Sequence, residues 1–372
     1  MDRLVILLGA DMIGVLARAW DNLLGRGEAA VTVPPLDGAL RPNRLLDEAR
    51  TRLPLEDVDC LAVASGRIVA SAGKALFELS ADAGWLPRGR YEADIAAIAA
   101  LGADGLAVAL ASGDILIEGG RFDGRRVGVA AVSCITALAA QGTDLFVANG
   151  SAVHSGADWQ RDLMMRSSSG SIWRIDLETG QASLVANGLG WPAGLVADGE
   201  GLVFSEAWKH RLVRIGLSGT PRPQHLVADF PGYPGRISKG SDGYWLAVFA
   251  PRSQLVEFVL REPAYRKRMI AEVPREFWIA PTMRSGRSFY EPLQGGGVKH
   301  LGMLKPWAPT MSAGLCVRLD AGFRLQSSLH SRADGATHGV TSAVEHEGRV
   351  FVAARGDGVV VRLDAGEQGG EA

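Results

Sequence analysis

A turn followed by a short apolar strand recurs along this chain, and this repeat limits the possible folds more than any other feature. It occurs six times, at residues 65–69, 104–108, 143–147, 199–204, 242–246 and 347–351. The first two intervals are about 40 residues long, which is typical of a four-stranded propeller blade. The two longest intervals contain additional sequence, at about 150–170 and about 250–313.

The repeat therefore predicts an all-β fold, a six-bladed β-propeller over residues 55–365 with two insertions. Residues 1–54, which contain two Pro-rich stretches, are predicted to form an N-terminal helix and an extended strap. Residues 366–372 are predicted to form a flexible tail. Each insertion falls between the second and third strands of its blade. That loop returns to the face at which the innermost strand begins, so both insertions are expected to cover one mouth of the central channel.

The composition excludes several classes of function. Lys and Arg number 39 and Asp and Glu number 41, so we expect no nucleic-acid partner. Cys60, Cys134 and Cys316 each lie in an apolar run, where a buried hydrophobe is favoured over a reactive thiol. A reducing, cytoplasmic location suits them. The apolar residues 4–8 are interpreted as a packed helix, with a secretory signal as the alternative.

Candidate site residues follow from the topology. Glu56, Arg236, His338 and Thr341 lie where innermost strands are predicted to begin, and Asn149 and Glu206 lie where second strands are predicted to end. His300 and Trp307 belong to the larger insertion. Its residues 261–278 are predicted to form a short amphipathic helix that caps the channel, and contact with a membrane is not expected. The oligomeric state is left open.

The stretch GSIWRIDLETGQASLVANGLGWPAGLVADGEGLVFSEAWKHRLVRI, at 170–215, resembles strictosidine-synthase-like proteins. The motifs DWQRDL at 158–163 and FPGYPGRISKGSDGYWLAV at 230–248 extend the resemblance over about 55–364. The family is related to gluconolactonases and paraoxonases. The resemblance implies a small-molecule hydrolase of lactones or esters, or a related condensing enzyme, that works at the channel mouth.

The same resemblance raises the question of a metal. In metal-dependent relatives a divalent ion is held by Glu, Asn and Asp side chains at these strand ends. Glu56 matches the Glu and Asn149 lies near a second ligand position, but Ala193 and Gly235 stand where two further ligands belong. We therefore predict no tightly bound metal, and the sequence indicates no other cofactor. Thr341 stands where the alkaloid synthases have a catalytic Glu, so strictosidine synthase activity is not expected.

Two functions remain open. In the first, a hydrolase, Glu56 or His338 acts as acid or base, Arg236 anchors an anionic group, and Asn149, Glu206, His300, Trp307 and Thr341 contact the substrate. In the second, the propeller binds a small molecule or a partner without catalysis. Each main residue has a structural alternative: Glu56 bonds backbone amides, Arg236 pairs with Glu56, His338 is structural, and Glu206 forms a surface ion pair. A small polar or anionic molecule is the expected ligand in both cases.

Overall fold

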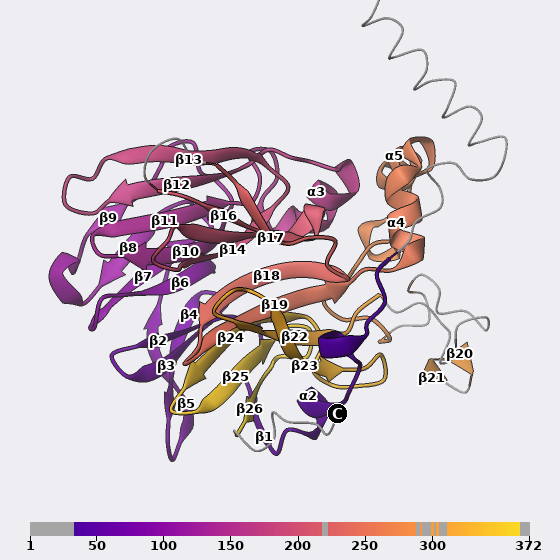
Figure 1. Cartoon of the computed structure of the whole chain (residues 1–372), viewed down its shortest axis with the longest axis horizontal. Coiled ribbons are helices and arrows are strands. Elements are labelled where there is room, and N and C mark those ends of the chain that lie inside the picture. The colour runs from indigo at the N-terminus through magenta and orange to yellow at the C-terminus, as the bar shows by residue number, and fades with distance from the viewer. Residues whose placement is uncertain are drawn as a thin grey trace, which may run out of the picture.

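The computed structural model describes residues 33–217, 222–287, 291, 299–300, 303–304 and 311–364. Their strands form six antiparallel sheets of four strands each (Figure 1). The innermost strands contact one another in sequence, and the last of them, β24, also contacts the first, β2. The sheets therefore close into a ring, which is the predicted six-bladed β-propeller.

The blades follow the order of the chain, apart from the outermost strand of the sixth. Blade 1 contains β2 (Val58–Ala64), β3 (Arg67–Ala72), β4 (Ala75–Ser80) and β5 (Gly84–Arg90). Blade 2 contains β6 (Ile95–Leu101), β7 (Gly105–Leu110), β8 (Ile115–Glu118) and β9 (Arg126–Val127). Blade 3 contains β10 (Ile135–Gln141), β11 (Asp144–Asn149), β12 (Gly170–Asp176) and β13 (Ala182–Leu189). Blade 4 contains β14 (Pro192–Ala197), β15 (Leu202–Glu206), β16 (Arg211–Ile215) and β17 (Gln224–Val227).

Blade 5 keeps this order but is interrupted by the second insertion, and blade 6 departs from it. Blade 5 contains β18 (Gly232–Lys239), β19 (Gly243–Pro251), β22 (Gly314–Asp320) and β23 (Leu325–Ser331). Blade 6 contains β24 (Val340–His346), β25 (Arg349–Ala354) and β26 (Val359–Leu363), and its outermost strand is β1 (Thr51–Pro54). The first strand of the chain thus completes the last blade.

The recurring turn has a local physical cause. Between β2 and β3, Ser65 and Gly66 both have positive φ, at 51° and 70°. Between β24 and β25, Glu347 and Gly348 repeat this geometry at 50° and 72°. Two consecutive residues with positive φ form the hairpin turn that matches the twist of antiparallel strands, and glycine adopts this conformation without steric strain.

Ring closure depends on the segment before β1. Thr51 pairs with Arg362, and Pro54 pairs with Val359. The short helix α2 (Leu45–Glu48) precedes this strand, and its Leu46 is fully buried in an apolar cluster with residues of blades 5 and 6. The segment predicted as a strap therefore ends in a strand of the ring. The helix expected near the N-terminus lies outside the described residues.

The two insertions lie on the same side of the ring, at the right of Figure 1. The first contains the 3₁₀ turn η3 (Gly156–Asp158) and helix α3 (Trp159–Met165). The second contains α4 (Gln254–Arg261), α5 (Pro263–Glu272), η5 (Arg275–Phe277) and the short strands β20 (Lys299–His300) and β21 (Met303–Leu304). None of the described helices has the length and apolar character needed to cross a bilayer.

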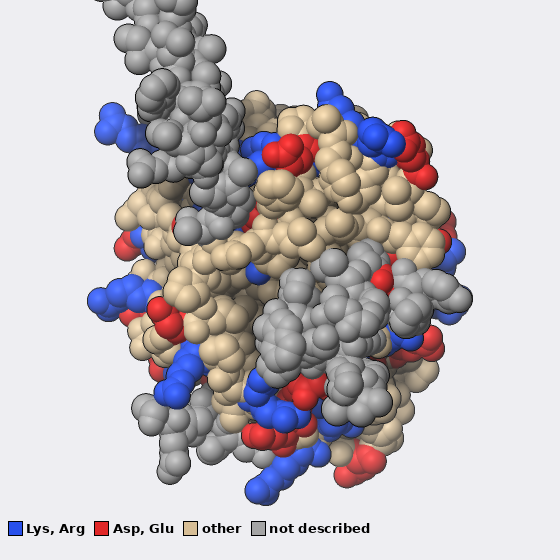
Figure 2. Space-filling view, turned by 90° about the vertical axis from the view of Figure 1, so that its right-hand side faces the viewer, with Lys and Arg blue, Asp and Glu red and all other residues tan. Residues whose placement is uncertain are grey.

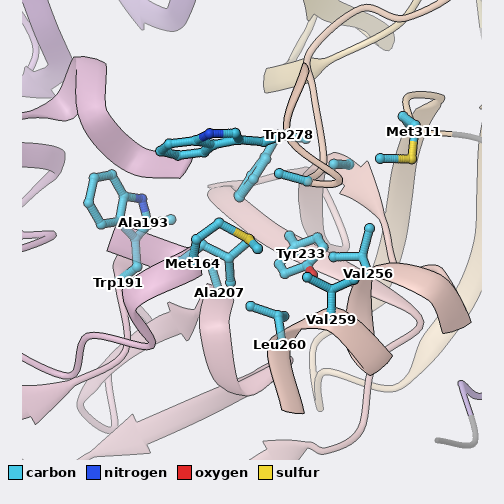
Figure 3. Packing of buried hydrophobic residues seen from close by; sticks show 14 of the residues in the cluster. Met164, Trp191, Ala193, Ala207, Tyr233, Val256, Val259, Leu260, Trp278 and Met311 are labelled. Carbon is cyan, nitrogen blue, oxygen red and sulfur yellow. The ribbon is translucent and has the colours of Figure 1, made fainter. Parts of the chain in front are cut away.

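Within the region predicted as one helix, 261–278, the structure has α5 at Pro263–Glu272 and η5 at Arg275–Phe277, and Arg261 is the last residue of α4. Glu262 adopts φ −97° and ψ 84°, outside the helical region, and Pro263 begins α5, because proline suits the first turn of a helix but interrupts its interior. Both insertions bury their apolar side chains in one cluster with blades 4 and 5 (Figure 3). Met164 comes from α3, and Val256, Val259 and Leu260 come from α4.

Substitution of Leu46 tests whether α2 belongs to the folded unit. Leu46→Ala should lower the free energy of unfolding by about 2–5 kcal/mol, because it leaves a cavity in a packed core. Leu86→Ala is the matched control, since Leu86 is 46% exposed on the outer strand β5. Urea denaturation measures both. Equal, small losses in the two variants would show that α2 does not stabilise the ring.

Candidate functional site

A cavity of about 500 Å³ lies at the channel mouth on the side of the insertions. All six innermost strands contribute to its wall, through Asp59, Ile95, Ile135, Ala193, Arg236 and Thr341. On this side of the molecule, charged side chains lie mainly toward the edge (Figure 2). A cavity of this size can hold a small molecule.

The innermost strands present these side chains because each has an irregular register near its start. A bulge of this kind inserts an extra residue and redirects the neighbouring side chains. In β2 the irregular pairing falls between Val58 and Leu61 and includes Asp59. In β18 it falls between Pro234 and Ile237 and includes Arg236.

Arg236 links blade 5 to three other blades across the channel. Its Nη2 donates to Asp59 Oδ2 at 2.7 Å and to the carbonyl of Ala96 at 2.8 Å. Its Nη1 donates to the carbonyls of Asp59 and Thr341, both at 3.2 Å. Thr341 Oγ1 also donates to the Asp59 carbonyl, at 2.7 Å. The guanidinium therefore occupies the centre of the channel and forms the floor of the cavity.

Asp59 lies between two arginines. Its Oδ2 accepts from Arg236, and its Oδ1 accepts from Arg355 Nη1 at 3.2 Å. Burial raises the pKa of Asp59, but the charges of Arg236 and Arg355 outweigh this effect and hold the pKa below its usual value of 3.8. The carboxylate is therefore ionised near neutral pH, but its lowered pKa and its bonds to two guanidinium groups make it a poor proton acceptor and hence a poor candidate for a general base.

Two charged groups remain available to a ligand. The side chain of Arg355 is 48% exposed, and Asp59 is its one ion-pair partner among the described residues. Its other N–H groups can donate to a molecule in the cavity. Asp94 also lines the cavity, and in the described part of the chain its carboxylate has no hydrogen-bond partner.

The opposite wall is apolar and aromatic. It contains Trp159 from α3, Trp191, Phe249 and Met283. Trp159 packs edge-on against Phe249 with ring centroids 5.5 Å apart. Trp191 and Ala193 lie at one side of the buried cluster (Figure 3). The cavity thus combines an apolar surface with a small number of charged groups.

The structure brings together some of the predicted site residues and not others. Arg236 and Thr341 line the cavity, as predicted. The expectation that Glu56 and His338 face the same cavity is wrong. Glu56 is exposed in the turn before β2. It does not pair with Arg236, whose carboxylate partner is Asp59.

His338 is fully buried beside the second insertion. Its Nδ1 contacts Arg284 Nη1 and Ser312 Oγ, each at 2.8 Å, and its Nε2 lies 2.6 Å from the carbonyl of Arg332. Burial and the charge of Arg284 lower its pKa. These contacts give His338 a role in holding the insertion on the ring, and its role as an acid or base stays a prediction.

Asn149 and Glu206 are buried outside the cavity wall. Asn149 Oδ1 accepts from the backbone amide of Cys134 at 2.9 Å, which supports a residue of the wall. Glu206 accepts from the amide of Gly190 at 2.7 Å and pairs with Lys209 at 2.6 Å and with Arg211. The ion pair that was expected at the surface is therefore part of a buried cluster of charged groups. The side chains of His300 and Trp307 lie outside the described residues.

Sequence reasoning missed several polar residues near the mouth. Asp59 and Arg355 were not among the candidates: Asp59 is the second residue of β2, and Arg355 begins the turn that follows β25. In the first insertion, His154 Nδ1 lies 3.0 Å from Asp162 Oδ2, and Trp208 Nε1 donates to Asp162 Oδ1 at 2.7 Å. Asp162 is fully buried. The pair is adjacent to residues 155–157, which line the cavity.

A divalent cation does not fit this arrangement. Hard cations need several oxygen ligands, but Ala193 and Gly235 supply no side-chain oxygen and Asp59 is held by two guanidinium groups. A Cβ added at Gly235 would lie only 3.1 Å from the Ala247 carbonyl. The part of the chain that the structure describes has no cluster of three or more His, Cys, Asp or Glu side chains suited to a metal. The absence of a tightly bound metal in solution stays a prediction.

No protein-family profile matches the sequence, and no curated protein matches it. Solved structures match in fold. A gluconolactonase from Xanthomonas campestris has a TM-score of 0.54 at 12% identity, covering 90% of this chain and 95% of that one. A calcium-binding protein, regucalcin, from Agrobacterium tumefaciens has a TM-score of 0.53 at 11% identity, covering 85% and 93%. A luciferin-regenerating enzyme has a TM-score of 0.54 at 11% identity, covering 84% and 92%. These identities establish a shared fold alone.

The contribution of Asp59 to stability should depend on pH. Asp59→Asn leaves Arg236 buried without its counter-charge, which should lower the free energy of unfolding by about 3–5 kcal/mol at pH 7. The folded-state pKa of Asp59 lies below its unfolded value. The contribution of the carboxylate is therefore complete above pH 3.8 and disappears as the pH falls through the folded-state pKa.

Urea denaturation of wild type and Asp59→Asn from pH 7 downward measures this difference. The control is Asp114→Asn, because Asp114 forms an exposed pair with Arg126 at 2.8 Å and exposed pairs contribute little. A difference between wild type and Asp59→Asn that stays constant on acidification would contradict the assignment.

Proposed function

We propose that the protein binds a small molecule with an apolar body and an anionic group in the channel-mouth cavity. The observation that carries this proposal is how the charged groups at the cavity are paired with one another. Asp59 neutralises Arg236. Asp59 is also the one carboxylate that Arg355 contacts among the described residues, so other N–H groups of Arg355 can bind a ligand. The guanidinium of Arg355 can hold a carboxylate through two parallel hydrogen bonds. The aromatic wall of Trp159, Trp191 and Phe249 suits the apolar body of the ligand.

Hydrolysis of a lactone or ester is the second candidate function. Asp94 favours it, because an unpartnered carboxylate at the cavity can accept a proton from an attacking water. The resulting hydroxy acid would carry the anionic group that Arg355 binds. The fold shared with a gluconolactonase adds support, although the identity is only 12%. Membership of the strictosidine-synthase-like family remains part of this proposal, carried by the motifs at 158–163, 170–215 and 230–248.

The mechanism under this second candidate uses residues of this chain alone. Arg355 would orient the ester through its carbonyl or a neighbouring carboxylate, and the aromatic wall would limit access of bulk water. Asp94 would take the proton of the attacking water, and the leaving alkoxide would receive a proton from solvent or from Asp94. Arg236 would form the floor of the cavity without contacting the reacting atoms, because the Asp59 carboxylate and three backbone carbonyls occupy its Nη groups.

Matched ligand pairs test the binding proposal. A lactone and its hydroxy acid differ chiefly in the carboxylate, so calorimetry should show that the acid binds about tenfold or more tightly, as expected for one charge-assisted contact. Arg355→Met should abolish this difference. Arg349→Met should preserve it, because Arg349 is similarly exposed and paired, at 3.1 Å from Asp364, but lies at the other end of β25. The proposal would be overturned if the wild-type protein bound each hydroxy acid and its lactone with equal affinity across a panel of aliphatic and aromatic compounds.

Release of acid from the same lactones and from aryl esters tests hydrolysis. Asp94→Asn should lower kcat by about 100-fold or more if Asp94 is the base. Asp104→Asn is the control, since Asp104 lies in the turn at the opposite end of β6. Turnover should also persist in the presence of a chelator. Turnover that the Asp94 substitution leaves unchanged would exclude this mechanism, while binding would be judged separately by calorimetry.

A further inference from the structure

An arginine is buried where the two insertions meet. Arg266 of α5 is only 8% exposed. Its Nη1 donates to the carbonyl of Leu260, and its Nε is buried without a hydrogen-bond partner. Within the described ranges no carboxylate forms an ion pair with it. A buried cation without a counter-charge is costly, so an anion that binds beside it would be stabilising.

A second arginine lies close to the first. Arg166 ends α3, which contacts α5. Burial lowers the pKa of Arg266, and the positive charge of Arg166 lowers it further. The side chain of Arg166 is exposed and has no ion-pair partner among the described residues. Two positively charged side chains thus come from contacting helices, and neither forms an ion pair with a carboxylate in the described part of the chain.

The backbone of Arg166 is also unusual. Its φ of 54° and ψ of 44° place it in the left-handed region, and its amide donates to the carbonyls of Leu163 and Asp162 to end the helix. Glycine is favoured at this position, and other residues are strained there by about 1–2 kcal/mol. An arginine therefore occupies a position whose backbone geometry favours glycine.

Nearby carboxylates do not neutralise the two arginines. Asp162 of α3 bonds His154 and Trp208. Glu257 of α4 accepts from Tyr233 at 3.1 Å and pairs with Arg252 at 3.4 Å. Glu272, on α5, pairs with Arg268 at 3.2 Å. Glu262 precedes Arg266 by one turn, but no ion pair joins them in the described structure.

We propose that Arg266 and Arg166 form a binding site for a phosphate-type oxyanion between α3 and α5. Arg266 supplies a buried donor and Arg166 supplies an exposed donor at the rim. Guanidinium groups suit phosphate because their paired N–H donors match two of its oxygens. The anion can be free phosphate or the head group of an anionic phospholipid. This site is separate from the channel-mouth cavity and does not depend on the function proposed for it.

The test uses the full chain and two probes. Inorganic phosphate is titrated by calorimetry and thermal melting against chloride at the same ionic strength, and vesicles of phosphatidylcholine with or without phosphatidic acid are used for co-sedimentation. Wild type should bind one of these probes. Arg166→Gln should weaken that binding at least tenfold with an unchanged melting temperature in the absence of anion. The control, Arg268→Gln, removes an exposed arginine of α5 that is already paired, and it should bind like wild type.

A second variant keeps the proposal testable if phosphate also binds elsewhere. Arg266→Met removes the buried charge, so the variant should be at least as stable as wild type without anion and should gain no stability from phosphate. Phosphate binding alone would identify a free anion as the ligand, and vesicle binding alone would identify a lipid head group. The proposal is overturned if wild type binds neither probe, or if Arg166→Gln and Arg268→Gln behave alike.

Discussion

The ion pair between Arg236 and Asp59 is the interaction on which the centre of this propeller depends. Isolated in a channel walled by apolar strands, either charge would be strongly destabilising. Together they offset each other's charge, and the two Nη groups of Arg236 also bond carbonyls of blades 1, 2 and 6. A single side chain of blade 5 therefore connects four of the blades.

Much of the fold could be predicted from the sequence, because the blades repeat a hairpin, and in five of the six the turn between the first two strands contains a residue with positive φ. The Ser65–Gly66 and Glu347–Gly348 pairs are local signals that do not depend on distant contacts. The positions of both insertions followed from the spacing of these hairpins. The strand at residues 51–54 could not be found in this way, because its partner is β26, and no local pattern reports such a distant pairing.

The site was harder to predict, since side-chain direction depends on one-residue irregularities. The expected acid, Glu56, precedes β2 and is exposed, whereas Asp59 lies in the irregular register of that strand and faces the channel. In a strand, a shift of one residue moves a side chain to the opposite face. Arg236 was identified because it follows a Gly-Tyr-Pro-Gly corner. Its partner was not, because nothing in the sequence shows which residues of distant blades converge on a channel.

The pairing of β1 with β26 has a consequence for the order in which the chain is made. Thr51 leaves the ribosome early, whereas Arg362, its partner, emerges among the last residues of the propeller. Until then the ring lacks its closing contacts, and β1 has an unpaired edge that can bind other strands. Contacts between residues so far apart in sequence also slow folding. During synthesis this edge therefore stays open to other strands until β26 has been made, and only then can the ring close.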